Sequence, residues 1–202
     1  MPVMNKDQQT LHVLLIDDDA ERATALSAAL DKSRYQVSHL VGSESSLLKE
    51  VDSRQPDIII IDVESPDRDI LESLHTLNTV NPKPIVMFSE QEDTQLINQS
   101  TRSGVSAYVV GADVSNSKVK TILDAAIARF DQMQQLRDQL EESKRQLASQ
   151  KVIDQAKVLL METKKISEKE AYQHIRKIAM DNGQRMDQVA KNIIAIIRTL
   201  TA

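Results

Sequence analysis

The feature that most constrains the fold is a helical pattern that runs without a break from about residue 119 to residue 161. In its first part, apolar residues recur at steps of three and four and form a broad stripe, as on a helix that packs against a domain. These residues are Val119, Ile122, Leu123, Ala126, Ile127 and Phe130. The pattern therefore predicts one long helix that begins inside a folded domain.

The apolar stripe of this helix narrows after residue 130. Alternating steps of three and four suit a two-stranded coiled coil. The narrow seam consists of Met133, Leu136, Leu140, Ser143 and Leu147. We therefore predict a coiled-coil linker over residues 129–150 that forms a homodimer. A single exposed helix in a monomer is the alternative, because the seam lasts only about three heptads and includes a serine.

Length and charge favour two small domains, one at each end of this helix. The chain has 202 residues, enough for two small domains and a helix between them. Residues 1–150 carry 15 Lys and Arg against 24 Asp and Glu, whereas residues 151–202 carry 10 against 6. A basic tail behind an acidic front indicates a polyanionic partner for the tail. Aromatic residues make up only 2% of the chain, which argues against base stacking on an aromatic sheet.

Several classes of protein are disfavoured by what the sequence lacks. There are 0 Cys, which excludes disulfides and zinc–cysteine sites. No apolar run reaches membrane-spanning length, and residues 1–10 lack the apolar core of a signal peptide. There is no Walker loop or glycine-rich dinucleotide motif, and the four His lack the spacing of metal ligands. We expect a cytoplasmic protein that has no contact with a membrane.

Residues 11–128 alternate between short apolar runs and helical patterns. The predicted strands are residues 12–16, 35–41, 58–61, 84–88 and 105–110. The predicted helices are residues 20–30, a helix with Leu47, Leu48 and Val51 that starts at Ser43 or Ser45, and residues 67–80 and 94–102. This alternation is typical of an α/β fold with a doubly wound, parallel, five-stranded sheet.

Polar side chains follow three of these strands. Asp17 and Asp18 follow the first strand, Asp62 the third and Ser89 the fourth. In such sheets, sites form beyond the carboxyl ends of the strands. Converging carboxylates resist ionisation unless a cation lies among them, and Mg²⁺ prefers oxygen ligands. We therefore predict a Mg²⁺ site at the three carboxylates, where one of them can attack a phosphoryl donor. Capping of the next helix is the alternative for any single Asp, as we expect of Asp19.

With these motifs, residues 12–127 resemble the receiver domain of bacterial response regulators. The resemblance implies a flavodoxin-like fold with Asp17 and Asp18 as the acidic metal pair and Asp62 as the phosphoacceptor. It also implies that Ser89 and Tyr108 are the switch hydroxyl and the switch aromatic residue.

The segment after the fifth strand departs from the receiver pattern. Gly111 and Ala112 stand where receivers usually carry a Lys-Pro pair. The lysine ammonium would have paired with Asp62 and with the phosphoryl group. We therefore expect the acidic pocket to persist while phosphorylation no longer controls the protein.

Residues 151–202 predict a small three-helix core. After a loop at residues 163–166, Ser167 and Glu170 form a capping-box pattern at the start of a helix. Asn182 and Gly183 end this helix, and a last helix carries apolar residues from Met186 to Ile197. Each helix alone would be marginally stable, so we expect the three to pack together.

This tail resembles the ANTAR domain, a three-helix RNA-binding module of transcription antiterminators, and the resemblance begins at about residue 131. The match rests on residues 153–161, 167–172, 175–176, 179–180 and 189–190. It departs in Val158, where glycine is usual, and in Ile175, where leucine is usual. The receiver segments 62–69, 84–88 and 104–108 are similar to those of NasT-type regulators of nitrate assimilation.

Cations around the predicted bundle are the candidate RNA contacts: Lys151, Lys157, Lys164, Lys165, Arg176, Lys177 and Arg185. For any one of them, a solvated helix surface is the alternative. Tyr172 is a candidate for stacking on an unpaired loop base, with a role in the apolar core as the alternative. Because sequence-specific RNA readers target accessible loops, a hairpin is the expected ligand.

The resemblance implies an antiterminator that binds paired hairpins in leader mRNA and is not an enzyme. It also implies control by a nitrate-sensing regulatory protein that holds the chain inactive. Two other classes stay open. A DNA-binding response regulator would need a helix for the major groove, and the tail shows no helix-turn-helix pattern. An interaction adaptor would bind its partner without binding nucleic acid.

Overall fold

The computed structural model of the chain describes residues 10–30, 32–41, 47–63, 66, 68–111 and 116–201. The predicted helix start at Ser43 or Ser45 and Ala112 lie outside these residues. The chain folds into two compact units, Met1–Gln134 and Gln135–Ala202. The elements are β1 (Leu11–Asp17), α1 (Ala20–Ala29), β2 (Tyr35–Val41), α2 (Leu47–Arg54), β3 (Ile58–Asp62), α3 (Arg68–Val80), β4 (Ile85–Ser89), α4 (Thr94–Arg102), β5 (Ala107–Val110), α5 (Asn116–Lys164), α6 (Glu168–Asp181) and α7 (Met186–Thr201).

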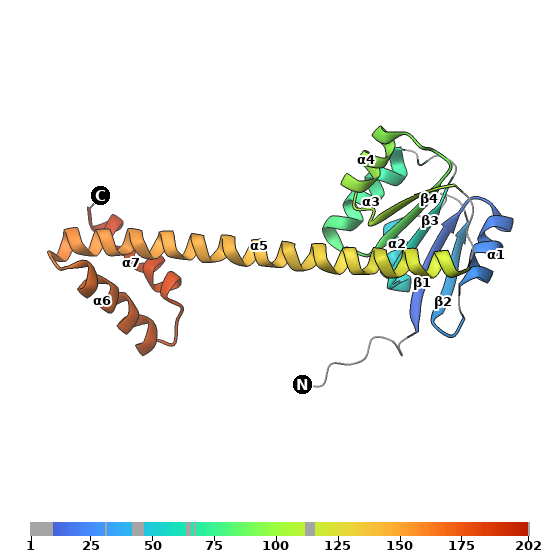
Figure 1. Cartoon of the computed structure of the whole chain (residues 1–202). Coiled ribbons are helices and arrows are strands. Elements are labelled where there is room, and N and C mark those ends of the chain that lie inside the picture. The colour runs from blue at the N-terminus through green and yellow to red at the C-terminus, as the bar shows by residue number, and fades with distance from the viewer. Residues whose placement is uncertain are drawn as a thin grey trace. The chain divides into compact units, whose positions relative to one another are not determined.

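The first unit is built on a parallel sheet with the strand order β2-β1-β3-β4-β5 (Figure 1). Every neighbouring pair of strands is parallel. The predicted α/β fold, with a five-stranded parallel sheet followed by a long helix and a small helical bundle, is confirmed. In a sheet of this order, the central strands β1, β3 and β4 bring their carboxyl ends to one edge.

Alternating side chains of the central strands fill two apolar cores. Ile58 and Ile60 of β3 pack in the core that contains apolar residues of α1 and the start of α5. Ile59 and Ile61 pack on the other face with apolar residues of α2 and α3. All four are at most 1% exposed, which explains why β3 is a continuous apolar run rather than an alternating one.

The structure differs from the sequence expectation at several element boundaries, and two of these differences have a clear physical reason. β5 begins at Ala107 rather than at Val105, because Val105 is apolar to fill the second core and not to pair in a strand. The predicted loop at residues 163–166 is wrong for Thr163 and Lys164, which belong to α5. The Thr163 hydroxyl donates to the Leu159 carbonyl, 2.7 Å away, and the helix ends only before Lys165, which has φ +55°.

The second unit is a bundle of the end of α5, α6 and α7 around its own apolar core. The core residues are Ile153, Ala156, Leu160, Ala171, Ile175, Ala179, Val189, Ala190 and Ile197. The predicted capping box is present: the Glu170 amide donates to the Ser167 hydroxyl, and the Ser167 amide donates to the Glu170 carboxylate. Gly183, at φ +60°, lets the chain turn after α6. Among the described helices, none has an apolar stretch that could cross a membrane.

Candidate functional site

The carboxyl edge of the sheet brings together acidic residues from two neighbouring strands. Asp17 ends β1 and Asp62 ends β3, and the two stand opposite each other in the parallel register. Asp17 is fully buried, Asp62 is partly exposed, and the Asp18 side chain is mostly exposed. Asp19 caps α1, as expected, by accepting from the amides of Glu21 and Arg22.

The electrostatic environment of Asp62 favours its neutral form. Burial raises the pKa of Asp62 to about 6, and the nearby charge of Asp17 adds to the rise. The charge of Arg22 opposes this rise only in part. A carboxyl group in this state gains from any additional cation that enters the pocket.

Arg22 is a resident cation of the acidic pocket that sequence reasoning missed. Its Nη2 donates to Asp17 Oδ1 over 3.1 Å and also to Asp18 Oδ1. The signal was available, because Arg22 follows Asp18 by four residues and lies in the first turn of α1. It was overlooked since an arginine at the start of a helix is ordinarily a solvated surface residue.

One buried oxygen atom indicates whether the pocket suits a metal ion. Asp17 Oδ2 is buried and, within the described residues, has no hydrogen-bond partner. A buried carboxylate oxygen without a partner is costly, and a hard cation would satisfy it. Within the same residues, however, no three His, Asp or Glu side chains are arranged to hold a metal ion. Asp17, Asp18 and Asp62 therefore suit Mg²⁺ chemically but do not form a preassembled site.

The two residues predicted to form the switch pair converge on the loop after β4. The Ser89 side chain is buried, and its hydroxyl accepts from the Gln91 amide over 3.2 Å. The Tyr108 hydroxyl donates to the Gln91 carbonyl over 3.1 Å. The two side chains thus contact the same residue, so a change at either one can reach the other through Gln91.

Gly111 occupies the place of the usual lysine in a backbone conformation that few side chains adopt. Its φ is +88°, although a Cβ built there meets no atom within 4 Å. Because L residues are strained at such φ values, a lysine would not fit here without a backbone change. The described pocket therefore has the Arg22 guanidinium on its Asp17 side and no ammonium from the end of β5.

All but one of the predicted RNA contacts are exposed on the second unit. The exposed cations are Lys151, Lys164, Lys165, Arg176, Lys177 and Arg185. Lys157 is the exception, since its side chain is 13% exposed and lies 2.7 Å from both Asp154 and Glu168. The pair with Asp154 lies within α5 and the pair with Glu168 connects α5 to α6, so the charge of Lys157 is already neutralised. Tyr172 is 42% exposed and therefore does not have the predicted alternative role in the core.

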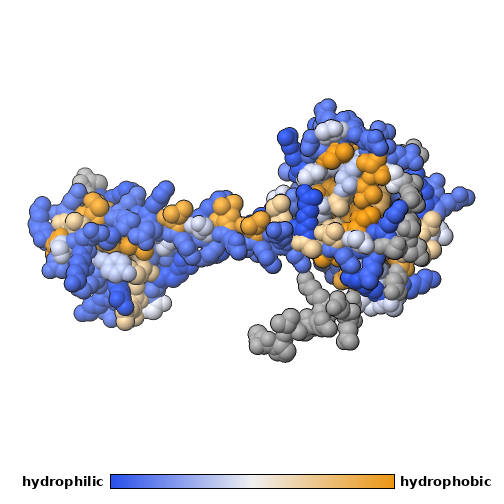
Figure 2. All heavy atoms as spheres, viewed as in Figure 1, coloured by the Kyte–Doolittle hydropathy of each residue, from blue (hydrophilic) through white to orange (hydrophobic). Residues whose placement is uncertain are grey.

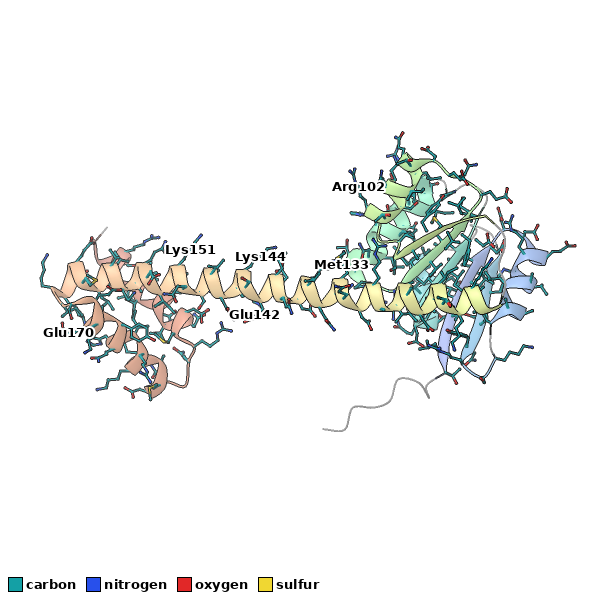
Figure 3. All side chains as sticks on the ribbon, viewed as in Figure 1. Arg102, Met133, Glu142, Lys144, Lys151 and Glu170 are labelled. Atoms are coloured by element: carbon teal, nitrogen blue, oxygen red, sulfur yellow. The ribbon has the colours of Figure 1, made fainter. Side chains whose placement is uncertain are left out.

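A polar hollow of about 280 Å³ on the second unit joins α5 to the segment before α7. It is lined by Glu142, Arg145, Gln146, Ser149, Gln150 and Arg185. Arg145 was not predicted, because it precedes the basic tail in sequence. Figure 3 labels Lys144 and Lys151 on one side of α5 and Glu142 on the other. The hollow therefore brings Arg145, whose Nη2 lies 2.8 Å from Glu142 Oε2, to the same surface as Arg185.

The narrow seam of α5 is exposed along its length. Its apolar side chains, Met133, Leu136, Leu140 and Leu147, are 49–61% exposed. Figure 2 shows apolar side chains on the surface of this part of the helix. Such a series on one helix face is typical of a surface that meets another helix.

Comparisons with known proteins agree with both halves of this description. Residues 13–112 match the response regulator receiver domain, and residues 134–194 match the ANTAR domain. The chain is 25% identical over 187 residues to the transcriptional regulatory protein PdtaR of Mycobacterium tuberculosis, an alignment that covers 93% of this chain and 91% of that protein. It is 35% identical over 77 residues to the nitrate regulatory protein of Klebsiella oxytoca, which is 38% of this chain and 19% of that protein.

A solved structure shows the receiver fold. The signal receiver domain of a modulated diguanylate cyclase from Desulfovibrio desulfuricans G20 superposes with a TM-score of 0.53 at 18% identity. The superposition covers 62% of this chain and 99% of that domain. The matched families are regulatory rather than catalytic. The chain belongs to the response regulators that combine a receiver domain with an ANTAR domain.

Proposed function

We propose that this chain is a transcription antiterminator whose C-terminal bundle binds paired hairpins in leader mRNA. The observation that carries the proposal is the set of exposed cations on a unit that matches the ANTAR domain. Several of them can contact phosphates at once, and the exposed Tyr172 can stack on a loop base. We assign the receiver to residues 11–128, the linker to 129–150 and the RNA-binding bundle to 151–202.

We propose that a sensor partner controls this activity more than phosphorylation does. Asp62 has the position of a phosphoacceptor, with Ser89 and Tyr108 as the switch pair, but the pocket receives no ammonium at Gly111. A Mg²⁺ at Asp17, Asp18 and Asp62 would neutralise the carboxylates. The similarity to a nitrate regulatory protein supports nitrate or nitrite assimilation genes as targets and a nitrate-sensing protein as the partner.

We further propose that the exposed seam of α5 pairs two copies of the chain. Leu136, Leu140 and Leu147 are each more than half exposed, and a parallel second seam would cover them. Two bundles held together in this way match a ligand with two hairpins, because linked sites bind with higher avidity than single ones.

The test is a titration of the full-length chain and of a fragment of residues 129–202 with a two-hairpin leader RNA. The fragment retains the apolar core of the second unit and the whole seam. A DNA duplex of equal charge is the control. We expect both proteins to bind the RNA more tightly than the DNA, and the full-length chain to bind more weakly because its receiver masks the bundle.

Two results would overturn the proposal. Equal affinity for RNA and DNA would indicate non-specific binding to polyanions or a DNA-binding regulator. Binding to neither would indicate an adaptor that acts through protein contacts alone.

In an antitermination assay, Asp62→Asn should leave regulated activity nearly intact, and a large loss would show that phosphorylation is the signal.

A further inference from the structure

The acidic pocket of the receiver contains a cation from its own chain, and this bears on how it binds a metal. Arg22 Nη2 bridges Asp17 Oδ1 and Asp18 Oδ1. These are two of the three carboxylates that suit Mg²⁺. Since Mg²⁺ takes oxygen ligands at about 2.0–2.1 Å in a strict octahedron, it needs the oxygens themselves together with room for its waters.

We propose that Arg22 and a divalent cation are alternative occupants of the Asp17–Asp18 carboxylates, so that Mg²⁺ binds only when the Arg22 guanidinium moves away. Arg22 then lowers the metal affinity of the pocket and holds it in a metal-free state. The inference concerns the receiver alone and holds whether or not the chain binds RNA.

Two independent observations indicate that the pocket takes a cation. Asp17 Oδ2 is buried and, in the described part of the chain, lacks a hydrogen-bond partner, so Arg22 satisfies only one of the two oxygens of this carboxylate. Asp62 faces Asp17 across the β1–β3 register and adds a further carboxylate to the pocket. One guanidinium is therefore too little charge for the three carboxylates.

Simultaneous occupancy is disfavoured by charge and by geometry. A guanidinium and a divalent cation on the same carboxylates would repel each other at close range in a partly buried pocket. The Arg22 side chain is 28% exposed, so it can swing toward water without opening the core. Asp18 is 58% exposed and can follow either cation. The buried Asp17 stays fixed, and it is the carboxylate for which the two cations compete.

The test is a calorimetric titration of the full-length, unphosphorylated chain with Mg²⁺. We compare the wild type with Arg22→Met, which keeps the length and apolar character of the side chain and removes its charge. We expect Mg²⁺ to bind Arg22→Met about tenfold more tightly, since a charge-assisted contact no longer has to be broken. Mg²⁺ should also raise the Tm of Arg22→Met more than that of the wild type.

Arg54→Met is the matched control. Arg54 also makes an ion pair with an acidic residue four positions away, Glu50, at 2.7 Å, but it lies on α2 and outside the pocket. We expect its Mg²⁺ affinity to equal that of the wild type. An equal gain in Mg²⁺ affinity in both variants would show that the effect comes from the change in net charge alone, and it would overturn the proposal.

Three further results decide the matter. Adding Asp17→Asn to Arg22→Met must abolish the gain, and a gain that survives would place the metal elsewhere and overturn the proposal. Unchanged or weaker Mg²⁺ binding by folded Arg22→Met would also overturn it. If Arg22→Met does not fold, the NMR signal of the Arg22 guanidinium in the wild type decides. Saturating Mg²⁺ must shift this signal, and a signal that stays in place rules out displacement.

Discussion

The same helix meets two different environments, and the comparison shows what its apolar pattern can and cannot reveal. In the first unit, Val119 and Leu123 of α5 are 0% exposed because the sheet covers them. In the second unit, Leu136 and Leu140 continue the apolar pattern but are 53% and 55% exposed. Periodicity thus identifies the apolar face of the helix. Only the tertiary structure shows whether other parts of the same chain cover that face.

The largest expected effect separates the two environments by stability. Leu123→Ala should lower the free energy of unfolding of the receiver by about 2–5 kcal/mol, because it leaves a cavity in a closed core. Leu140→Ala should lower the free energy of unfolding by less than about 0.5 kcal/mol, because no core surrounds Leu140 in the single chain. Urea unfolding followed by circular dichroism measures both values.

The receiver transition must be resolved from that of the bundle for this comparison. Ile175→Ala, in the core of the second unit, provides the marker, since it should shift only the bundle transition. At protein concentrations too low for self-association, equal losses from Leu123→Ala and Leu140→Ala would mean that the exposed seam is covered within one chain.

The second prediction concerns self-association through the seam. Leu136→Glu combined with Leu140→Glu should raise the dissociation constant of the homodimer at least about tenfold, because buried apolar area is lost and four like charges approach one another. Sedimentation equilibrium over a dilution series measures the constant.

The matched control adds the same charge to the same helix outside the seam. Gln135→Glu with Ala148→Glu should leave the dissociation constant nearly unchanged, since both side chains are exposed on α5 and lie away from the seam and its flanking positions. A monomeric wild type would contradict the coiled-coil proposal directly.

The buried half of this comparison was the more predictable from sequence. Ile58–Ile61 predicted a central strand because few sequences other than buried strands carry four adjacent β-branched residues. Ser167 and Glu170 predicted the start of α6 because the capping box is a local interaction. Val105 misled the prediction, because apolar character reports burial and not strand pairing.

The candidate sites were predictable only as far as register and local capping allow. Alternating strands and helices were enough to bring Asp17 and Asp62 to one edge of the sheet. The rotamer that turns Arg22 onto Asp17 is a tertiary choice, and so is the pairing of Lys157 with Glu168, eleven residues away. No periodicity records such contacts, because each depends on how two elements meet.

The third prediction tests whether the partly buried Asp62 lowers the stability of the folded receiver in a way that exposed carboxylates do not. With EDTA present, Asp62→Asn should stabilise the receiver above pH 6 by roughly 1–2 kcal/mol. A shift of about two pKa units carries roughly 3 kcal/mol at most, and partial exposure screens it. Thermal unfolding over a range of pH measures the difference between variant and wild type.

The sign of this effect follows from the raised pKa. Asp62 goes from a pKa of 3.8 when unfolded to about 6 in the folded chain, so the folded state holds its proton more tightly. The contribution of Asp62 to stability is therefore full below about pH 4 and falls away as the pH rises through 6. The gain from Asp62→Asn should appear over the same window. A gain that is constant with pH would show that the substitution acts through packing instead.

The smallest expected effect comes from comparing an exposed cation of the bundle with one whose charge is paired within the protein. Arg176 is exposed, whereas the ammonium of Lys157 lies 2.7 Å from each of two carboxylates. Arg176→Gln should reduce the salt dependence of RNA binding by somewhat less than one unit in the log–log slope, as expected for one lost phosphate contact. Lys157→Gln should leave the slope unchanged, because its charge is already balanced within the protein. Fluorescence anisotropy with a labelled hairpin, repeated over a series of salt concentrations, measures both slopes.

Stability provides the internal control for this pair of variants. Lys157→Gln removes the link between α5 and α6, so it should lower the Tm of the bundle, whereas Arg176→Gln should not. A cation that contacts RNA and a cation that holds the fold together are then separated by opposite results in two assays. If Lys157→Gln lowers the salt slope as much as Arg176→Gln does, RNA must draw Lys157 out of its ion pairs. The contrast between buried and exposed charge would then hold only for the free protein, and the bundle would rearrange when it binds.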